Sequence, residues 1–247
     1  RDAQRALAEA RLAAAVPDVL LLLEHPPVYS KGRRSTAAEL PMGEDWYRAQ
    51  GIEVCETDRG GRVTYHGPGQ LVGYPIVSLE ALAERFGLGG GRPRADVVDY
   101  VRRMESVMIE ALGDSGVAAR TIDGLTGVWT RGARPDTDPG PGAARKIGSI
   151  GVHVSRGITT HGLAVNVDND LQPFEWVVPC GIEACLMTSL SRELGTRQAL
   201  WAFGERLVVR YEQAYRSRAT ETSIDELAVR APEAAELLGS GLGAPVA

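Results

Sequence analysis

Hydrophobic residues in the middle of the chain recur at helical spacing. They follow one another at steps of three and four residues: Val97, Val101, Met104, Val107, Met108, Ala111 and Leu112. This period predicts a long amphipathic helix whose apolar face packs on a sheet. We therefore interpret its two methionines as core residues and not as cofactor ligands.

Other helical patterns lie towards both ends of the chain. Residues 2–15 are rich in alanine and stop before Pro17, and residues 44–50 stop at Gly51. Ser223 and Glu226 have the spacing of a capping box for a late helix. Before it, a second apolar helical face is predicted with Thr196 as its N-cap. Its members are Leu200, Phe203, Leu207, Val208, Tyr211 and Tyr215.

Apolar runs without a helical period predict the strands. A buried strand is expected at 19–24, and further strands at 52–57, 63–66 and 71–77. Residues 147–154 and 158–167 alternate apolar and other side chains, as paired strands do, with a turn at 155–157. Helices and strands do not follow the regular βαβ order of a doubly wound fold. We therefore predict an α+β fold, a mixed β-sheet flanked by helices.

The composition fits one domain and excludes several function classes. With 247 residues, 44% of them hydrophobic, the chain can bury a full core, and we expect residues 1–247 to form a single domain. Residues 131–145, rich in proline and glycine, are expected to form a mobile surface loop. The net charge of −5 and the short apolar runs argue against nucleic-acid and membrane partners. Three cysteines without a secretory signal favour a reducing compartment, so we predict a cytoplasmic protein.

Cys180 is the candidate nucleophile, and Lys146 is the candidate cation beside it. A free thiol titrates near ~8.5, and the thiolate is the species that attacks. An ammonium about 4 Å away, at an effective dielectric of about 20, attracts a thiolate by roughly 4 kcal/mol and lowers the thiol pKa. The sequence alone does not place Lys146 beside Cys180, and a cysteine before glycine is also a common small core residue.

Glycine-rich stretches accompany this pair. Residues 59–70 surround Tyr65 and His66 with glycines that allow a backbone to approach a ligand closely, although an ordinary hairpin has a similar composition. Residues 146–151 and 161–166 offer glycine-flanked amides that can donate to a thioester oxyanion, at ~3 kcal/mol per donor. His161 alone is more often a structural histidine than a catalyst.

In their order along the chain, these motifs resemble the octanoyltransferase family of lipoate biosynthesis, often called LipB. The resemblance rests on RGGRVTYHGPGQLVGYPI, KIGSIGVHV, THGLAVNV, and PCGI followed by TSL, supported by LLLEHPPVYSKG and by GVW at 127–129. It implies a fold similar to the catalytic modules of biotin protein ligases and lipoate protein ligases. It also implies that the single domain is an octanoyltransferase catalytic domain.

The resemblance assigns roles to individual residues. The family's nucleophilic cysteine falls on Cys180 and its lysine on Lys146. Ser149 stands where alanine is common in the family, and the loop at 131–144 is longer than in many members. The implied acyl-substrate contacts are Arg59, Gly60, Gly61, Arg62, Val63, Thr64, Tyr65, His66, Ser149, Ile150, Gly151, Gly162, Leu163 and Ala164.

A two-step exchange through a thioester on Cys180 is the implied mechanism. The thiolate attacks octanoyl-acyl carrier protein, and a neutral lysine amine of the acceptor then attacks the acyl-enzyme. The implied acceptors are lipoyl domains of 2-oxoacid dehydrogenase complexes and the glycine cleavage H protein. The implied reaction needs neither a cofactor nor a metal. Lys146 would lower the thiol pKa or act as a base, and His66 would orient groups near the thiol.

Other interpretations stay open at this point. An ATP-dependent lipoate or biotin ligase and a protein-to-protein lipoyl amidotransferase share the implied fold. A non-catalytic acyl-carrier-binding protein would need Cys180 only as a buried side chain. A cysteine hydrolase is less well supported, because no His–Asn or His–Asp pair stands out apart from His161 and Asn166 on one strand. The cysteines and histidines lack the ligand spacing of a zinc site.

Overall fold

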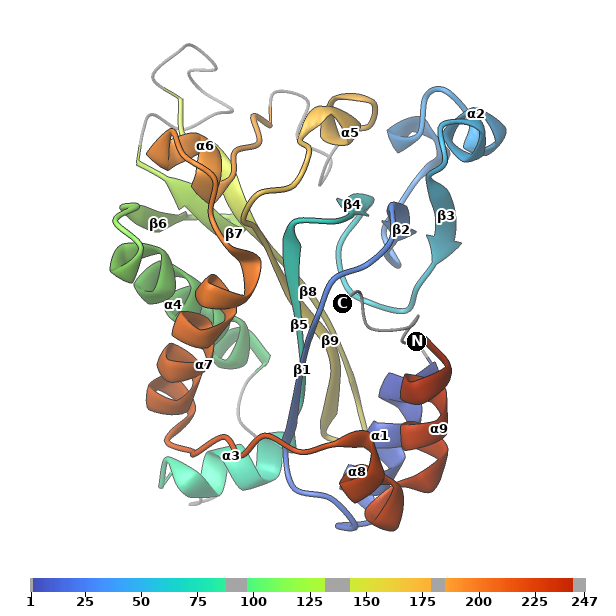
Figure 1. Ribbon diagram of the computed structural model, residues 1–247, viewed down its shortest axis with the longest axis vertical. Helices are drawn as coiled ribbons and strands as arrows, with labels where there is room; N and C mark the ends of the chain where they lie inside the picture. Colours follow the sequence, from blue (N-terminus) through green and yellow to red (C-terminus); the bar gives the residue numbers. More distant parts are fainter. Residues whose placement is uncertain (1, 88–96, 132–142, 179–184, 242–247) are drawn as a thin grey trace.

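Two β-sheets with helices around them make up the fold (Figure 1). A computed structural model describes residues 2–87, 97–131, 143–178 and 185–241. Cys180 and residues 132–142 of the predicted loop lie outside the described residues. Ala143 and Ala144, which we had expected at the end of that surface loop, are buried.

The larger sheet has six strands in the order β1-β5-β9-β8-β7-β6, and every neighbouring pair is antiparallel. The turn between β8 and β9 consists of Arg156 and Gly157, whose φ angles of 50° and 80° suit a tight hairpin turn. The predicted pairing of these two strands is therefore confirmed. The bounds are β1 Val19–Leu23, β5 Gln70–Ile76, β6 Ala119–Ile122, β7 Leu125–Thr130, β8 Lys146–Ser155 and β9 Ile158–Asn166.

The smaller sheet has three strands in the order β3-β2-β4, with β2 parallel to β3 and antiparallel to β4. The expected mixture of strand directions is thus found in this sheet, while the larger one is antiparallel. A second core lies against it, built around Tyr29, Tyr65 and Phe174. The bounds are β2 Val28–Lys31, β3 Glu53–Glu56, β4 Thr64–His66, α2 Glu44–Ala49, α5 Gln172–Glu175 and a 3-10 turn at Ala37–Glu39.

Helices cover the two faces of the larger sheet (Figure 1). On one face α3 (Leu79–Arg85), α4 (Val97–Asp114) and α7 (Leu200–Tyr215) bury the main core, which includes Met104 and Met108 as predicted. On the other face α1 (Asp2–Leu12), α8 (Ile224–Arg230) and α9 (Pro232–Gly241) enclose a third core. The first and last of these helices, α1 and α9, lie side by side. The short helix α6 (Leu190–Leu194) precedes α7.

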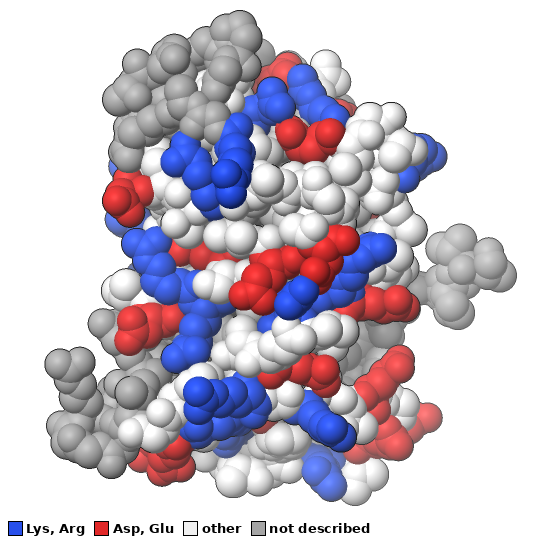
Figure 2. Space-filling view, turned by 90° about the vertical axis from the view of Figure 1, so that its left-hand side faces the viewer, with Lys and Arg blue, Asp and Glu red and all other residues white. Residues whose placement is uncertain are grey.

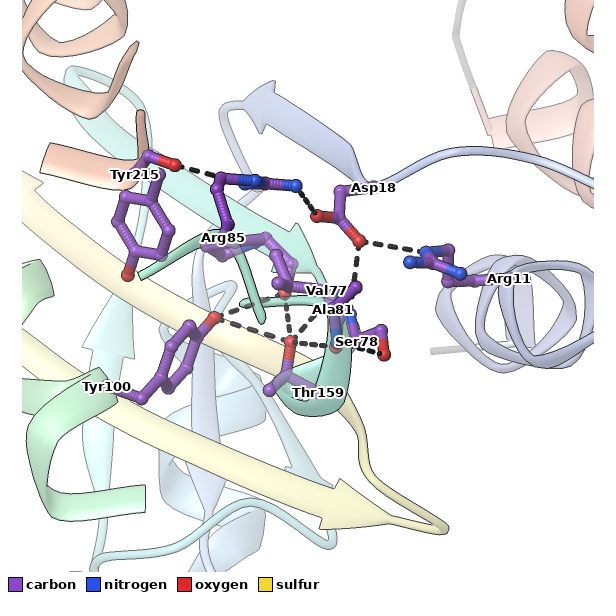
Figure 3. Close-up of polar contacts among 10 residues, drawn as sticks. Arg11, Asp18, Val77, Ser78, Ala81, Arg85, Tyr100, Thr159 and Tyr215 are labelled. Carbon is purple, nitrogen blue, oxygen red and sulfur yellow. Dashed lines mark hydrogen bonds and ion pairs between the residues drawn. The ribbon is translucent and has the colours of Figure 1, made fainter. Parts of the chain in front are cut away.

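A buried hydroxyl links β9 to the end of β5 and to α4 (Figure 3). Thr159 Oγ1 donates to the carbonyl of Pro75 at 2.7 Å and accepts from the backbone N–H of Val77 at 2.9 Å. The Tyr100 hydroxyl of α4 donates to Thr159 Oγ1 at 3.3 Å. Because Thr159 is fully buried, these partners replace water that it cannot reach.

Asp18 is a second polar junction in the same region (Figure 3). Its carboxylate accepts from Arg11 of α1 at 2.8 Å and from Arg85 of α3 at 3.0 Å. It also accepts from the backbone N–H of Ser78, the N-cap of α3, at 3.1 Å. One carboxylate therefore connects the start of β1 to helices on both faces of the sheet.

Charged residues on the outer side of α4 and α7 form local ion pairs. Figure 2 shows basic and acidic side chains interspersed over this side of the molecule. Arg210 of α7 binds Asp114 and lies 3.5 Å from Glu110 of α4. Arg103 stacks over the Phe86 ring at 3.7 Å. Within the described ranges, no helix is long and apolar enough to cross a membrane.

Three expectations about elements were wrong. β1 is an edge strand, and all its residues are only partly buried, because it has a neighbour on one side. Thr196 does not cap α7, which begins at Leu200 with Ala199 in the N-cap position and no side-chain cap. Thr196 instead follows the left-handed C-cap Gly195, which ends α6. The first helix ends at Leu12, before Ala14 turns to a φ of 55°.

Candidate active site

A cavity of about 820 Å³ lies where the smaller sheet faces β8 and β9. Its wall includes β2, β4 and the 59–62 segment on one side and the middle of β8 and β9 on the other. Val97, Val98 and Val101, at the start of α4, add apolar surface. A cleft of this size, with apolar surface beside several charged and histidine side chains, suits a small ligand or an acyl chain.

The cavity brings together most of the residues implicated by the sequence. The expected substrate contacts that line it are Arg59, Gly60, Gly61, Arg62, Thr64, His66, Ser149, Ile150, Gly151, Gly162, Leu163 and Ala164, and Lys146 lines it too. Val63 and Tyr65 do not, because they are buried in the core of the smaller sheet. Side chains alternate along β4, so Thr64 and His66 face the cavity while Tyr65 packs on Phe174.

The 59–62 segment lies directly on β8. The backbone N–H of Gly60 donates to the carbonyl of Val152 at 2.8 Å. A Cβ at Gly151 would be 2.9 Å from the Gly60 oxygen, so this approach requires glycine. Arg59 is buried, and its guanidinium donates to Ser30 Oγ at 2.8 Å and to the Gly60 carbonyl at 3.0 Å. These contacts fix the segment against the cavity wall.

Glu39 holds the other end of that segment. Its buried carboxylate accepts from Arg62 at 2.5 Å and from the Val63 backbone at 3.1 Å. The Glu39 backbone carbonyl accepts from the N–H of Val178, the last described residue before the segment that contains Cys180. One residue thus connects a cavity-lining segment to the chain that leads to the candidate nucleophile.

The side chain of Lys146 fits into space left by a glycine. Lys146 is 3% exposed, and a Cβ at Gly127 would come within 2.8 Å of its Cε and 2.5 Å of the Gly148 oxygen. The Lys146 ammonium lies 5.5 Å from the centre of the Trp129 ring, within the range of a cation–π interaction. The N–H of Gly127 donates to the buried carboxylate of Glu105 at 3.0 Å.

The backbone of Lys146 pairs with the segment that follows Cys180. Its N–H donates to the Leu186 carbonyl at 2.8 Å, and its carbonyl accepts from the Thr188 N–H at 3.0 Å. The described chain therefore re-enters the fold beside Lys146 only a few residues after position 180.

His66 and His161 have different partners in the cavity wall. His66 Nδ1 lies 2.7 Å from Gln70 Oε1, and burial lowers the pKa of His66 from 6.5 to about 3. His161 Nε2 lies 2.8 Å from Asp58, and its backbone N–H donates to Gln4 at 2.6 Å. Burial lowers the pKa of His161, although Asp58 opposes this shift. Both imidazoles are therefore neutral at pH 7.

The sequence analysis assigned no site role to three polar residues of this region. Glu105 lines the cavity wall and binds Arg102 at 2.9 Å. In the sequence, Glu105 stands out only as an acidic residue within the apolar face of the predicted helix. Gln70 and Asn166 are 2% exposed and joined at 2.8 Å, but neither has a sequence signal beyond its place in a motif. Among the described residues, no group of three or more acidic, histidine or cysteine side chains could hold a metal ion.

Comparison with known proteins decides the family. Residues 2–212 match the family model of the lipoyl protein ligase A/B catalytic domain. The chain belongs to this family. An octanoyltransferase of Acidobacterium capsulatum is 45% identical over 202 residues, covering 81% of this chain and 77% of that protein. An octanoyltransferase of Mycobacterium tuberculosis is 49% identical over 192 residues, covering 78% of this chain and 71% of that protein.

The predicted fold is confirmed by solved structures of lipoylation enzymes. A bipartite lipoate protein ligase from Thermoplasma acidophilum superposes with a TM-score of 0.69 at 16% identity, over 97% of this chain and 88% of that one. At this identity the likeness concerns the fold alone. In this chain, the cavity lies between the two sheets.

Proposed function

We propose that this chain is an octanoyltransferase that moves an octanoyl group from octanoyl-acyl carrier protein to a lysine of a lipoyl domain. Two relatives with 45% and 49% identity carry the name octanoyltransferase, and both alignments cover more than two thirds of each chain. We also propose that residues 1–247 form a single catalytic domain. The reaction takes place in the cytoplasm, where a nucleophilic thiol stays reduced.

The observation that carries the mechanism is the position of Lys146. Its side chain is buried in the cavity wall, and its backbone is hydrogen-bonded to Leu186 and Thr188. Cys180 precedes these residues by a few positions, and Val178 anchors the chain on the other side. Both anchors support a position of Cys180 near Lys146, where a cation stabilises the thiolate over the thiol.

In the first step the Cys180 thiolate attacks the thioester carbon of the donor. A new carbon–sulfur bond forms, the bond to the phosphopantetheine sulfur breaks, and that sulfur leaves with the proton that Cys180 gave up. In the second step the neutral amine of the acceptor lysine attacks the acyl-enzyme. A carbon–nitrogen bond forms, the bond to Cys180 breaks, and the proton lost by nitrogen restores the thiol.

The small residues of β8 and β9 make the backbone of this wall accessible to the substrate. Ser149 pairs with Ala164 and Gly151 pairs with Gly162, on either side of the Ile150–Leu163 pair, so alternate rows of the two strands carry small side chains. Ile150, Leu163 and Val101 supply apolar surface in the same cavity. An octanoyl chain has about six methylenes, and their burial at ~0.8 kcal/mol each contributes roughly 5 kcal/mol to binding.

The proposed acceptors are the lipoyl domains of 2-oxoacid dehydrogenase complexes and the glycine cleavage H protein. Each presents a lysine amine, and the second step requires such an amine. An acyl carrier protein as donor and a protein lysine as acceptor leave no role for ATP.

Donor choice tests this function against the ligase alternative. Purified chain is mixed with a lipoyl domain and either octanoyl-acyl carrier protein or octanoate with ATP, and the octanoylated domain is measured by mass spectrometry. We expect product with the carrier protein alone and no release of AMP with octanoate and ATP. Product formed only with octanoate and ATP would contradict the proposal and favour a ligase.

A further inference from the structure

A chain of buried hydrogen bonds runs from the Lys146 region to His66. Asn166 Nδ2 donates to the Thr188 carbonyl at 2.9 Å, and Gln70 Nε2 donates to Asn166 Oδ1 at 2.8 Å. Gln70 Oε1 lies 2.7 Å from His66 Nδ1. The side chains are between 0% and 8% exposed, so water does not compete with these bonds. Gln70 and Asn166 are direct register partners on β5 and β9.

Two backbone carbonyls fix the donor and the acceptor of every hydrogen bond in this series. The Thr188 carbonyl can only accept, so the amide nitrogen of Asn166 faces it and its oxygen faces Gln70. Gln70 must then present its nitrogen to Asn166, and the same nitrogen donates to the Tyr65 carbonyl at 3.2 Å. The Gln70 oxygen is therefore left for His66, and an amide oxygen can only accept.

It follows that Nδ1 of His66 carries the proton. Burial, with smaller contributions from His25, Arg59 and His161, lowers the pKa of His66 to about 3, so the ring is neutral. A neutral imidazole protonated at Nδ1 has a lone pair at Nε2. None of the described residues provides a hydrogen-bond partner for Nε2, and His66 lines the cavity. The wall thus offers a fixed acceptor to whatever enters.

The reacting group that needs an acceptor is the amine of the second step. The oxyanion and the departing thiolate need donors, and the Cys180 thiol has lost its proton once the thioester exists. Lys146 and Arg59 line the same cavity, and their charges disfavour an ammonium there. A neutral amine has hydrogens to donate, and one such bond directs its lone pair away from the acceptor.

We propose that His66 accepts a hydrogen bond at Nε2 from the amine of the acceptor lysine, and that Gln70 and Asn166 are positioning residues that hold its Nδ1-protonated form. This inference rests on the proposed octanoyl transfer. His66 ends the step as it began, because the proton lost by nitrogen passes to the Cys180 sulfur. The polar chain serves the second half-reaction, and acyl-enzyme formation does not depend on it.

Single-turnover experiments separate the two half-reactions. Formation of the octanoyl adduct is followed by intact mass, and the isolated acyl-enzyme is then mixed with a lipoyl domain. H66L removes the hydrogen-bond acceptor Nε2. We expect octanoyl transfer to the lipoyl domain to slow by about tenfold or more, and the rate of adduct formation to change by less than about twofold. H66Q retains an oxygen in the side chain and should recover part of the rate.

The positioning role is tested by Q70E. The glutamate cannot donate to Asn166 or Tyr65, and its charge favours a protonated His66, which turns Nε2 into a donor. We expect the same loss in the second half-reaction. Q213E makes the same change of charge at an exposed residue of α7 and should leave both rates unchanged.

Nitrogen-15 spectra of the imidazoles test the tautomer without any variant. In the folded wild-type chain at neutral pH, His66 should show a protonated Nδ1 and an unprotonated Nε2. A proton on Nε2, or equal transfer rates in H66L and wild type with normal adduct formation, would overturn the inference alone. If the wild type forms no octanoyl adduct, the proposed function itself is contradicted, and the inference with it.

Discussion

At the scale of single residues, Gly127 determines whether Lys146 can occupy its site. Its φ is +117°, and a Cβ there would lie 2.5 Å from the Gly148 oxygen and 2.8 Å from Lys146 Cε. In G127A we therefore expect transferase activity to fall at least about tenfold and the unfolding free energy to fall by about 1–3 kcal/mol. Activity assays and urea denaturation measure the two effects.

Gly157, in the turn between β8 and β9 and outside the cavity lining, is the matched control for backbone strain. Its φ is +80°, but nothing lies within 4 Å of the position of a Cβ. G157A should lose stability and keep most of its activity. Equal losses of activity in the two variants would contradict the claim that Gly127 makes room for Lys146.

His66 gives stability a defined dependence on pH. Its pKa is lowered from 6.5 to about 3 in the folded chain, so the unfolded chain binds more protons between these values. Stability is therefore complete above pH 6.5 and falls as pH decreases. Between pH 6 and 5, where few carboxylates titrate, we expect wild type to lose up to about 1.4 kcal/mol per pH unit more than H66Q. Parallel stability curves, measured by urea denaturation, would refute the buried neutral state.

Site residues differed in how far the sequence could reveal them. The glycine-rich segments could be recognised in the sequence, since close backbone contacts such as that of Gly151 with the Gly60 carbonyl require glycine itself. Tyr65 and Val63 share a motif with His66, yet the alternation of strand side chains turns them into a core. Gln70 and Asn166 are hydrogen-bonded to each other between two strands, and the register of β5 and β9 that brings them together cannot be read from either strand alone.

At the scale of elements, the Thr159 hydroxyl holds the end of β9 to β5 and α4. T159V keeps the shape but leaves the Pro75 carbonyl and the Val77 N–H without this partner. We expect a loss of about 1–3 kcal/mol in unfolding free energy, measured by urea denaturation. Thr160 points to the opposite side of β9 and is partly exposed, so T160V should change stability by less than about 0.5 kcal/mol. A stability of T159V equal to that of T160V would argue against the junction.

Elements with strong local signals were predicted and those defined by their neighbours were not. The period of α4 and the capping box of Ser223 and Glu226 are local, and both predictions are confirmed. The buried β1 and the cap at Thr196 were wrong, because edge position and the path between α6 and α7 depend on the packed fold. β6 and β7 were not predicted as strands, since their short runs have no clear alternation.

At the scale of the whole molecule, two sheets with separate cores line one cavity. His66 of the smaller sheet and the 59–62 segment before β4 line the cavity, together with Lys146 and the small residues of β8 and β9 in the larger sheet. The described residues that flank position 180 bind both parts, Val178 at Glu39 and Leu186 at Lys146. This arrangement predicts that the Lys146 cation acts on the Cys180 thiol.

Thiol alkylation measures that action. In wild type, Lys146 should favour the Cys180 thiolate at neutral pH, so K146M should slow alkylation of Cys180 by an uncharged reagent about tenfold or more. Peptide mapping distinguishes Cys180 from Cys55 and Cys185. The reaction of Cys55 serves as an internal control, because this exposed residue lies on β3 of the smaller sheet. An unchanged alkylation rate at Cys180 would contradict a role of Lys146 in the ionisation of the Cys180 thiol.

The central claim is that the octanoyl group passes through a thioester on Cys180. Intact mass spectrometry after incubation with octanoyl-acyl carrier protein tests it most directly. We predict one octanoyl increment on the wild type, its loss on adding a lipoyl domain together with a matching gain on that domain, and no increment on C180A. An adduct that persists at full yield in C180A, or one that the lipoyl domain does not remove, would contradict the account.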